Sequence, residues 1–138
     1  EGVHPDHHAW YINPHDPKMM IDGNDGGLNV TRDRGKTWLF AEGIPVGQWY
    51  HINVDNEIPY NIYGGLQDNG SWVGPAYVWR QDGIRNTYWQ EIMFGDGFDV
   101  VSDPENSRFG YAMSQGGNVA RFDKETSHRR IIRPTLPD

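Results

Sequence analysis

The sequence predicts an all-β fold built from short antiparallel strands, and three observations support this prediction. The chain of 138 residues contains 17 glycines and 9 prolines, which interrupt helices and favour turns. No window of about 11 residues free of Gly and Pro has the apolar spacing of an amphipathic helix. Short aromatic and β-branched runs alternate instead with turns rich in Gly, Asn and Asp.

Four strand-like runs occupy the first third of the chain. They are AWYIN (9–13), KMMID (18–22), LNVT (28–31) and TWLF (37–40). The separating segments PHDP, GNDGG and RDRGK have the composition of hairpin turns. This part of the chain is therefore predicted to be a four-stranded antiparallel unit.

The same order of strands and turns then returns twice. The second set is WYHINVD (49–55), YNIYGG (60–65), SWVG (71–74) and TYWQEI (87–92), and the third is GFDVVSDP (97–104), FGYAM (109–113), NVARFD (118–123) and RRIIR (129–133). Aligning the glycine of the central turn, Gly27, Gly70 and Gly117, gives spacings of 43 and 47 residues. Four strands in a repeat of this length are typical of a β-propeller blade.

We therefore expect residues 1–138 to be a partial β-propeller, with blades at approximately 7–45, 46–94 and 95–135. A single blade buries its faces only against neighbouring blades, and ring closure takes about four to eight of them. Three blades do not close a ring. The remaining blades of the same propeller are accordingly expected as partners of this segment.

The turn after the third strand has the sequence TRDRGKTW, residues 31–38. An aspartate at the start of a tight turn accepts hydrogen bonds from backbone N–H groups, and a glycine supplies a left-handed conformation. The tryptophan that follows is a large apolar plug. We therefore predict a structural role for Thr31, Asp33, Gly35, Thr37 and Trp38.

This motif resembles the BNR or Asp-box repeat, whose pattern is Ser/Thr-x-Asp-x-Gly-x-Thr-Trp, and all five specified positions match. With the flanking segments HPDHHAWYINPHDP, GGLQDNGSWVGP and GDGFDVVSDP, nearly the full chain is similar to bacterial Asp-box propellers of the sortilin-like and glycosyl-hydrolase-like group. The resemblance implies an extracellular or periplasmic bacterial protein. Three functions stay open: a scaffold that binds carbohydrate or peptide, a glycoside hydrolase, or purely structural blades.

The enzymatic alternative depends on three aspartates in glycine-rich turns. Related xyloglucanases carry a catalytic aspartate in a TDxGG turn, and the GNDGG segment places Asp25 directly before its glycine pair, one residue away from the family's spacing. Asp68 of LQDNG and Asp96 of FGDGF are the candidate partners. Two carboxylates about 6.5 to 9.5 Å apart serve an inverting glycosidase. The alternative is that all three aspartates only form turns.

A histidine-rich run, VHPDHHAW, precedes the first strand. The i, i+2, i+4 spacing of His4, Asp6 and His8 predicts that they share one face of an extended strand, where they could bind a metal ion or a sugar hydroxyl. His7 is then expected on the other face, in packing or in solvent. The alternative to ligand binding is that these side chains only pin the strand by hydrogen bonds. If they bind a ligand, we expect them to converge with the candidate catalytic aspartates at one end of the propeller channel.

The second repeat contains an insertion, GPAYVWRQDGIRNTYW, at residues 74–89. Long loops on a rigid scaffold often carry function. Trp79 of this loop is a candidate ligand-binding residue, because flat aromatic rings stack on sugar faces. Arg85 is the second candidate ligand-binding residue of the loop.

Composition and charge exclude several other functions. Lys and Arg total 12 against 19 Asp and Glu, a net charge of −7, which disfavours nucleic-acid binding because that affinity rests on neutralised phosphates. No apolar run approaches the roughly 20 residues that span a bilayer. The absence of cysteine excludes disulfides and thiolate sites. The DGNDGG turn is not expected to bind calcium, since Gly26 occupies the position where a calcium loop needs an oxygen ligand. No resident metal and no other cofactor is predicted.

Overall fold

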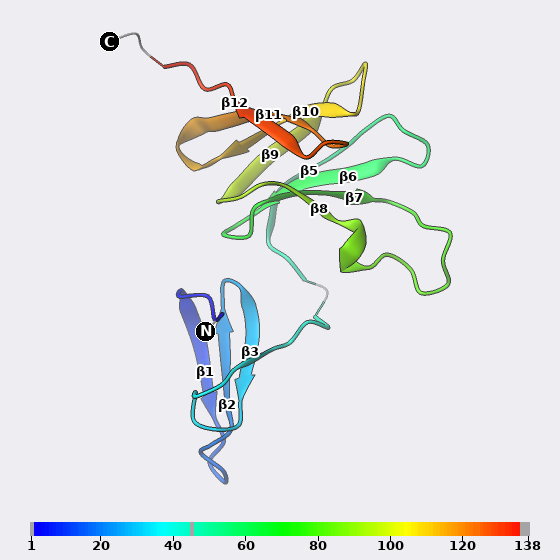
Figure 1. Ribbon diagram of the computed structural model, residues 1–138. Helices are drawn as coiled ribbons and strands as arrows, with labels where there is room; N and C mark the ends of the chain where they lie inside the picture. The colour runs from blue at the N-terminus through cyan, green and yellow to red at the C-terminus, as the bar shows by residue number, and fades with distance from the viewer. Residues whose placement is uncertain (1, 45, 136–138) are drawn as a thin grey trace. The chain divides into compact units, whose positions relative to one another are not determined.

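The computed structural model describes residues 2–44 and 46–135, and within these ranges the protein is all-β. The strands form three four-stranded antiparallel sheets (Figure 1). The helical segments of the described ranges are two short 3₁₀ turns, η1 (Asn86–Tyr88) and η2 (Gln115–Gly117), and no described helix is long and apolar enough to cross a bilayer. The prediction of an all-β chain with four-stranded units is confirmed.

The chain divides into two compact units, Glu1–Val46 and Gly47–Asp138. The first contains one sheet, with the strand order β1-β2-β3-β4. Its strands are β1 (His7–Ile12), β2 (Met20–Asn24), β3 (Gly27–Thr31) and β4 (Leu39–Phe40). Its buried side chains among the described residues are polar ones, Asp22, Asn29 and Thr31, and those of Asp22 and Thr31 make hydrogen bonds within the unit.

The second unit contains two sheets, with the orders β5-β6-β7-β8 and β12-β11-β10-β9. The strands of the first of these are β5 (Trp49–Val54), β6 (Asn61–Leu66), β7 (Ser71–Pro75) and β8 (Gln90–Met93). Those of the other are β9 (Gly97–Ser102), β10 (Phe109–Ser114), β11 (Asn118–Asp123) and β12 (His128–Ile131). Strand β9 packs against β5 and β6, which joins the two sheets into one body.

Glycines bring the two sheets of this unit into direct backbone contact. A Cβ atom added at Gly65 would lie 2.2 Å from the carbonyl carbon of Gly97, and one added at Gly97 would lie 2.2 Å from the carbonyl oxygen of Gly70. No larger residue fits at these positions without moving a strand. The same unit contains the buried hydrophobic cluster of the described residues: Tyr63, Val73, Ile92, Met93, Val100, Ala112, Ala120 and Phe122.

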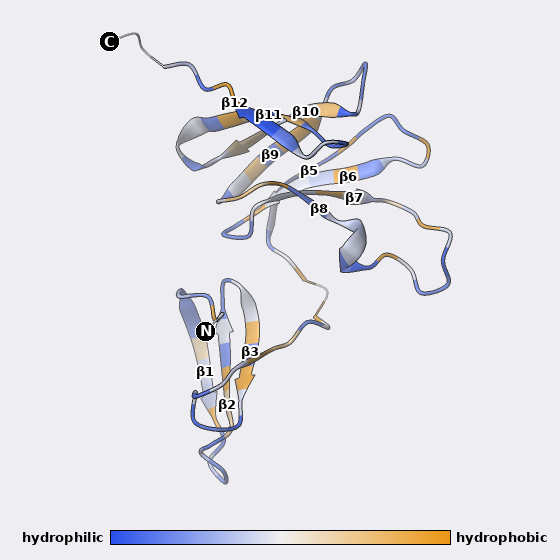
Figure 2. Cartoon of the chain, viewed as in Figure 1, coloured by the Kyte–Doolittle hydropathy of each residue, from blue (hydrophilic) through white to orange (hydrophobic). Residues whose placement is uncertain are grey.

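Strand β12 forms an edge of its sheet and is exposed along its length. Its sequence is His-Arg-Arg-Ile, and Figure 2 shows it as mostly hydrophilic. Charged side chains on an edge strand oppose pairing with the edge of another chain.

The turn glycines that define the repeat occupy equivalent positions in the three sheets. Gly27, Gly70 and Gly117 each lie at the turn between the second and third strands, with φ of 128°, 76° and 69°. These left-handed conformations favour glycine, which explains the spacing seen in the sequence.

Several strands begin one to three residues away from their predicted first residues, and for two of them the structure shows the reason. The strand predicted at 37–40 is confined to Leu39–Phe40, because Thr37 is held in the preceding turn. The strand predicted at 87–92 begins only at Gln90, because the 3₁₀ turn Asn86–Tyr88 and its C-cap residue Trp89 precede it.

Candidate functional site

The predicted ligand-binding residues of the N-terminal segment come together with Asp25 at the turn between β2 and β3. Asp25 and Gly26 form this turn, and the Asp25 N–H donates a 3.1 Å hydrogen bond to the carbonyl oxygen of Asp6. His8 Nε2 lies 2.5 Å from Asp25 Oδ1, and His4 Nδ1 lies 3.7 Å from Asp6 Oδ2. One donor atom from each of His4, Asp6 and Asp25 lies within 4.8 Å of the other two.

The backbone that brings these residues together differs from the predicted one. A continuous extended strand through His4, Asp6 and His8 is wrong, because β1 begins at His7 and its register shifts between His7 and Ala9. His4 instead lies over the hairpin turn. A Cβ atom on Gly26 would lie 2.9 Å from the Cβ of His4, so the missing side chain of Gly26 is what allows this approach.

An open hollow of about 340 Å³ adjoins His4 within the first unit. Polar and apolar side chains both contribute to its wall, so it offers hydrogen-bonding groups beside an aromatic ring. Its lining residues are Gly2, Val3, His4, Asn24, Gly26, Asn29 and Phe40.

His7 makes a contact that the sequence analysis missed. Its Nδ1 lies 2.8 Å from Oδ2 of Asp22, a residue that is 0% exposed. The Asn24 amide donates a second hydrogen bond of 2.8 Å to the same oxygen. The signal in the sequence was Asp22 itself, an acidic residue at the end of the apolar run KMMID. A carboxylate buried in such a strand requires hydrogen-bond donors from nearby residues.

The Asp33 carboxylate accepts hydrogen bonds within the turn between β3 and β4. Its Oδ1 accepts hydrogen bonds from the Thr31 hydroxyl at 2.8 Å and the Thr37 N–H at 2.9 Å. The bonds from the Thr37 hydroxyl and N–H and from the Thr31 hydroxyl lower the pKa of Asp33 to about 2. Gly35 is left-handed, with φ of 80°, and Trp38 packs edge-on against Trp10 at 5.8 Å between ring centroids.

Asp68 and Asp96 lie in adjacent turns of the second unit, whereas Asp25 belongs to the first unit. The Asp68 N–H donates a 2.9 Å hydrogen bond to Asp96 Oδ1. The Asp96 N–H in turn donates to Oε1 of Gln115 at 2.8 Å. The Asp96 carboxylate therefore stabilises the Asp68 turn, in which Asp68 itself has a φ of 58°.

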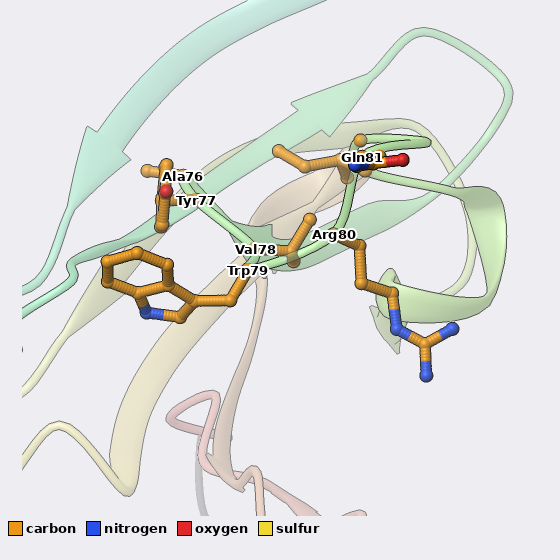
Figure 3. A pocket seen from close by; sticks show the side chains of 8 residues that line it. Ala76, Tyr77, Val78, Trp79, Arg80 and Gln81 are labelled. Atoms are coloured by element: carbon orange, nitrogen blue, oxygen red, sulfur yellow. The ribbon is translucent and has the colours of Figure 1, made fainter.

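The inserted loop of the second repeat presents an aromatic pair. Trp79 is 90% exposed, and its ring stands nearly perpendicular to that of Tyr77, with centroids 5.1 Å apart and an interplanar angle of 88°. Figure 3 shows the two rings together and the Arg80 side chain pointing away from them. Arg85 forms an ion pair with Asp82 three residues earlier. The loop borders an open pocket of about 580 Å³. Its lining residues are Ala76, Tyr77, Val78, Trp79, Arg80, Gln81, Gly83 and Ile84.

A polar network between the two sheets of the second unit was also missed. Oδ2 of the buried Asp55 accepts hydrogen bonds from the Tyr63 hydroxyl at 2.8 Å and the Asn61 amide at 2.7 Å. Lys124 Nζ lies 3.4 Å from the same oxygen and 2.7 Å from Oε1 of Glu57. Burial raises the pKa of Asp55, but the hydrogen bonds from Asn61, Tyr63 and the Glu57 N–H outweigh it and hold the pKa below its ordinary value. The network therefore ties β11 and its turn to β6 through a charged carboxylate.

Comparison of the chain with protein-family models, with curated proteins and with solved structures found no match.

Proposed function

We propose that this chain is a segment of an exported Asp-box β-propeller that binds a carbohydrate through the loop at residues 76–85. The remaining blades of the propeller are its partners, and the extracellular space or the periplasm is its location. Trp79 supplies the binding surface, and Tyr77 supports it.

The exposed aromatic pair carries this proposal. Trp79 is 90% exposed and forms with Tyr77 an aromatic surface in water, and covering this surface with an apolar ligand face is favourable. The C–H face of a pyranose is a flat apolar surface of suitable size, while the sugar hydroxyls need polar partners. Gln81 lines the same pocket, and its side-chain amide can donate a hydrogen bond to such a hydroxyl.

Two observations support the propeller proposal: the repetition of four-stranded sheets, and apolar side chains that are left exposed in the first unit. Three four-stranded sheets recur with turn glycines 43 and 47 residues apart, and β9 of one sheet packs on β5 and β6 of another. In the first unit, Trp10, Tyr11 and Ile12 are each more than half exposed. A neighbouring blade would cover such apolar side chains.

Binding to a panel of neutral and acidic oligosaccharides, including β-glucan fragments, tests the proposal. We expect Trp79→Ala to weaken binding about tenfold or more, equivalent to about 1.4 kcal/mol, while Trp79→Phe retains part of the affinity because it keeps a ring. Phe94→Ala is the matched control, since Phe94 is 72% exposed outside the loop. Equal binding by Trp79→Ala and the native protein, or binding of peptides but no sugars, would overturn the carbohydrate assignment.

A glycoside hydrolase is the second candidate, favoured by one observation. The hydrogen bond from the Asp68 N–H to Asp96 Oδ1 places two of the predicted catalytic residues in adjacent turns of one unit. An acid and base pair requires two carboxylates that both face the substrate. Because Asp96 already accepts a backbone hydrogen bond, carbohydrate binding without hydrolysis remains the preferred proposal.

A further inference from the structure

We propose that His4, Asp6 and Asp25 bind a divalent transition-metal ion, with Zn²⁺ as the first candidate. The ligands come from the segment before β1 and from the turn between β2 and β3, so the fold rather than one local motif assembles them. This site lies in the first unit and is independent of the proposed sugar-binding loop.

The spacing of the donor atoms suits a single ion. Zn²⁺ bonds to imidazole nitrogen and carboxylate oxygen are about 2.0 to 2.2 Å long, so two ligand atoms on one ion lie at most about 4 Å apart. The donor atoms of His4, Asp6 and Asp25 are already within 4.8 Å of one another. Small rotations of partly exposed side chains close the difference.

The backbone holds the ligands near this arrangement without the ion. The Asp25 N–H donates to the Asp6 carbonyl at 3.1 Å, which fixes the hairpin turn against the N-terminal segment. Gly26 leaves room for His4 above the turn, since a Cβ there would lie 2.9 Å from the His4 Cβ. Ligands held in place beforehand lose less conformational entropy when the ion binds.

His8 acts as a positioning residue. Its Nε2 lies 2.5 Å from Asp25 Oδ1, so an N–H at this nitrogen donates to the carboxylate that we propose as a ligand. Outer hydrogen bonds of this kind orient metal ligands, and their loss typically lowers metal affinity about 10- to 100-fold.

The donor set selects the class of metal. Two carboxylates and a neutral imidazole carry two negative charges, which a divalent cation balances. The imidazole favours Zn²⁺ and its transition-metal neighbours over Mg²⁺ and Ca²⁺, which prefer oxygen ligands alone. Three protein ligands leave a coordination position open, and His4 also lines the hollow of about 340 Å³, where a water molecule or a second ligand could take that position.

Calorimetric titration with Zn²⁺, on tag-free protein stripped with a chelator, tests the site. We expect one Zn²⁺ per chain, and an affinity that falls about tenfold or more in His4→Ala and in Asp25→Asn. His8→Ala should fall in the same direction by about tenfold. His15→Ala is the matched control, because His15 is an exposed histidine of the same unit outside the cluster, and its affinity should equal that of the native chain.

Two further measurements separate a built site from surface binding and from misfolding. Zn²⁺ should raise the melting temperature of the native chain and of His15→Ala by more than that of Asp25→Asn at the same Zn²⁺ concentration, and circular dichroism should show each variant folded. Co²⁺ in place of Zn²⁺ should give visible absorption bands that Asp25→Asn lacks. Unchanged Zn²⁺ affinity in folded Asp25→Asn and His4→Ala, or equal loss in His15→Ala, would overturn the assignment, and tighter binding of Ca²⁺ than of Zn²⁺ would overturn the metal class.

Discussion

The Thr37 hydroxyl donates a 2.6 Å hydrogen bond to Oδ2 of Asp33, while the Thr37 N–H donates to Oδ1 of the same carboxylate at 2.9 Å. One residue thus satisfies both oxygens of the aspartate from across the turn. The arrangement favours the ionised carboxylate, because each donor binds the charged form more strongly than the neutral acid. Protonation of Asp33 therefore weakens the turn that leads into β4.

Stability of the first unit should accordingly depend on pH through Asp33. The pKa falls from an ordinary 3.8 to about 2 in the fold, so the unfolded chain binds the proton more readily than the folded one. The contribution is fully present above about pH 4 and is lost as the pH falls through about 2. We expect Asp33→Asn to be less stable than the native chain at pH 5, and this difference to disappear near pH 2.

Urea unfolding followed by tryptophan fluorescence measures this difference, because Trp38 and Trp10 are in contact in the same unit. Glu42→Gln, an exposed change in that unit, is the control and should follow the native curve at both pH values. A stability difference for Asp33→Asn that is the same at pH 2 and pH 5 would contradict the assigned role.

The backbone contact between the sheets of the second unit predicts a large effect for Gly65→Ala. The new Cβ would meet the carbonyl carbon of Gly97 at 2.2 Å, so β6 and β9 must separate. Overpacking of this kind typically costs about 1 to 3 kcal/mol. Chemical denaturation checks the value, with Gly43→Ala as the control because a Cβ there has no atom within 4 Å. A Gly65→Ala variant as stable as Gly43→Ala would mean that the two backbones are not in contact.

Tyr63→Phe tests the network between the same two sheets. Tyr63 is 0% exposed, and burial together with its hydrogen bond to Asp55 raises the pKa of the phenol above its ordinary value, so the hydroxyl stays protonated as a donor. Loss of a hydrogen bond to a charged group costs about 1.5 to 3 kcal/mol. We expect that loss in denaturant unfolding, and a far smaller change for Tyr111→Phe, whose ring is partly exposed on β10. Equal losses for both variants would count against the network.

Local sequence patterns predicted the strands and turns, whereas contacts between residues far apart in the sequence were not predicted. The left-handed glycines and the Asp33 turn follow from residues within a few positions of one another. Lys124 and Asp55 are 69 positions apart, and no local pattern pairs them. The histidine cluster was predicted only in part. Its residues were found by their density, but their meeting with Asp25 depends on how the segment before β1 crosses the hairpin turn.

Asp96 offers a test that separates a structural carboxylate from a catalytic one. Its Oδ1 accepts the Asp68 N–H at 2.9 Å, and an asparagine keeps an oxygen at this position while losing the charge. If the side chain only holds the turn, Asp96→Asn should retain most of the stability, and Asp96→Ala should lose about 0.5 to 1.5 kcal/mol. If it is catalytic, both variants should lose hydrolysis of β-glucan oligosaccharides even where Asp96→Asn remains as stable as the native chain. Unfolding curves and reducing-sugar assays on the three proteins distinguish these outcomes, because only the second role depends on the ability of the side chain to ionise.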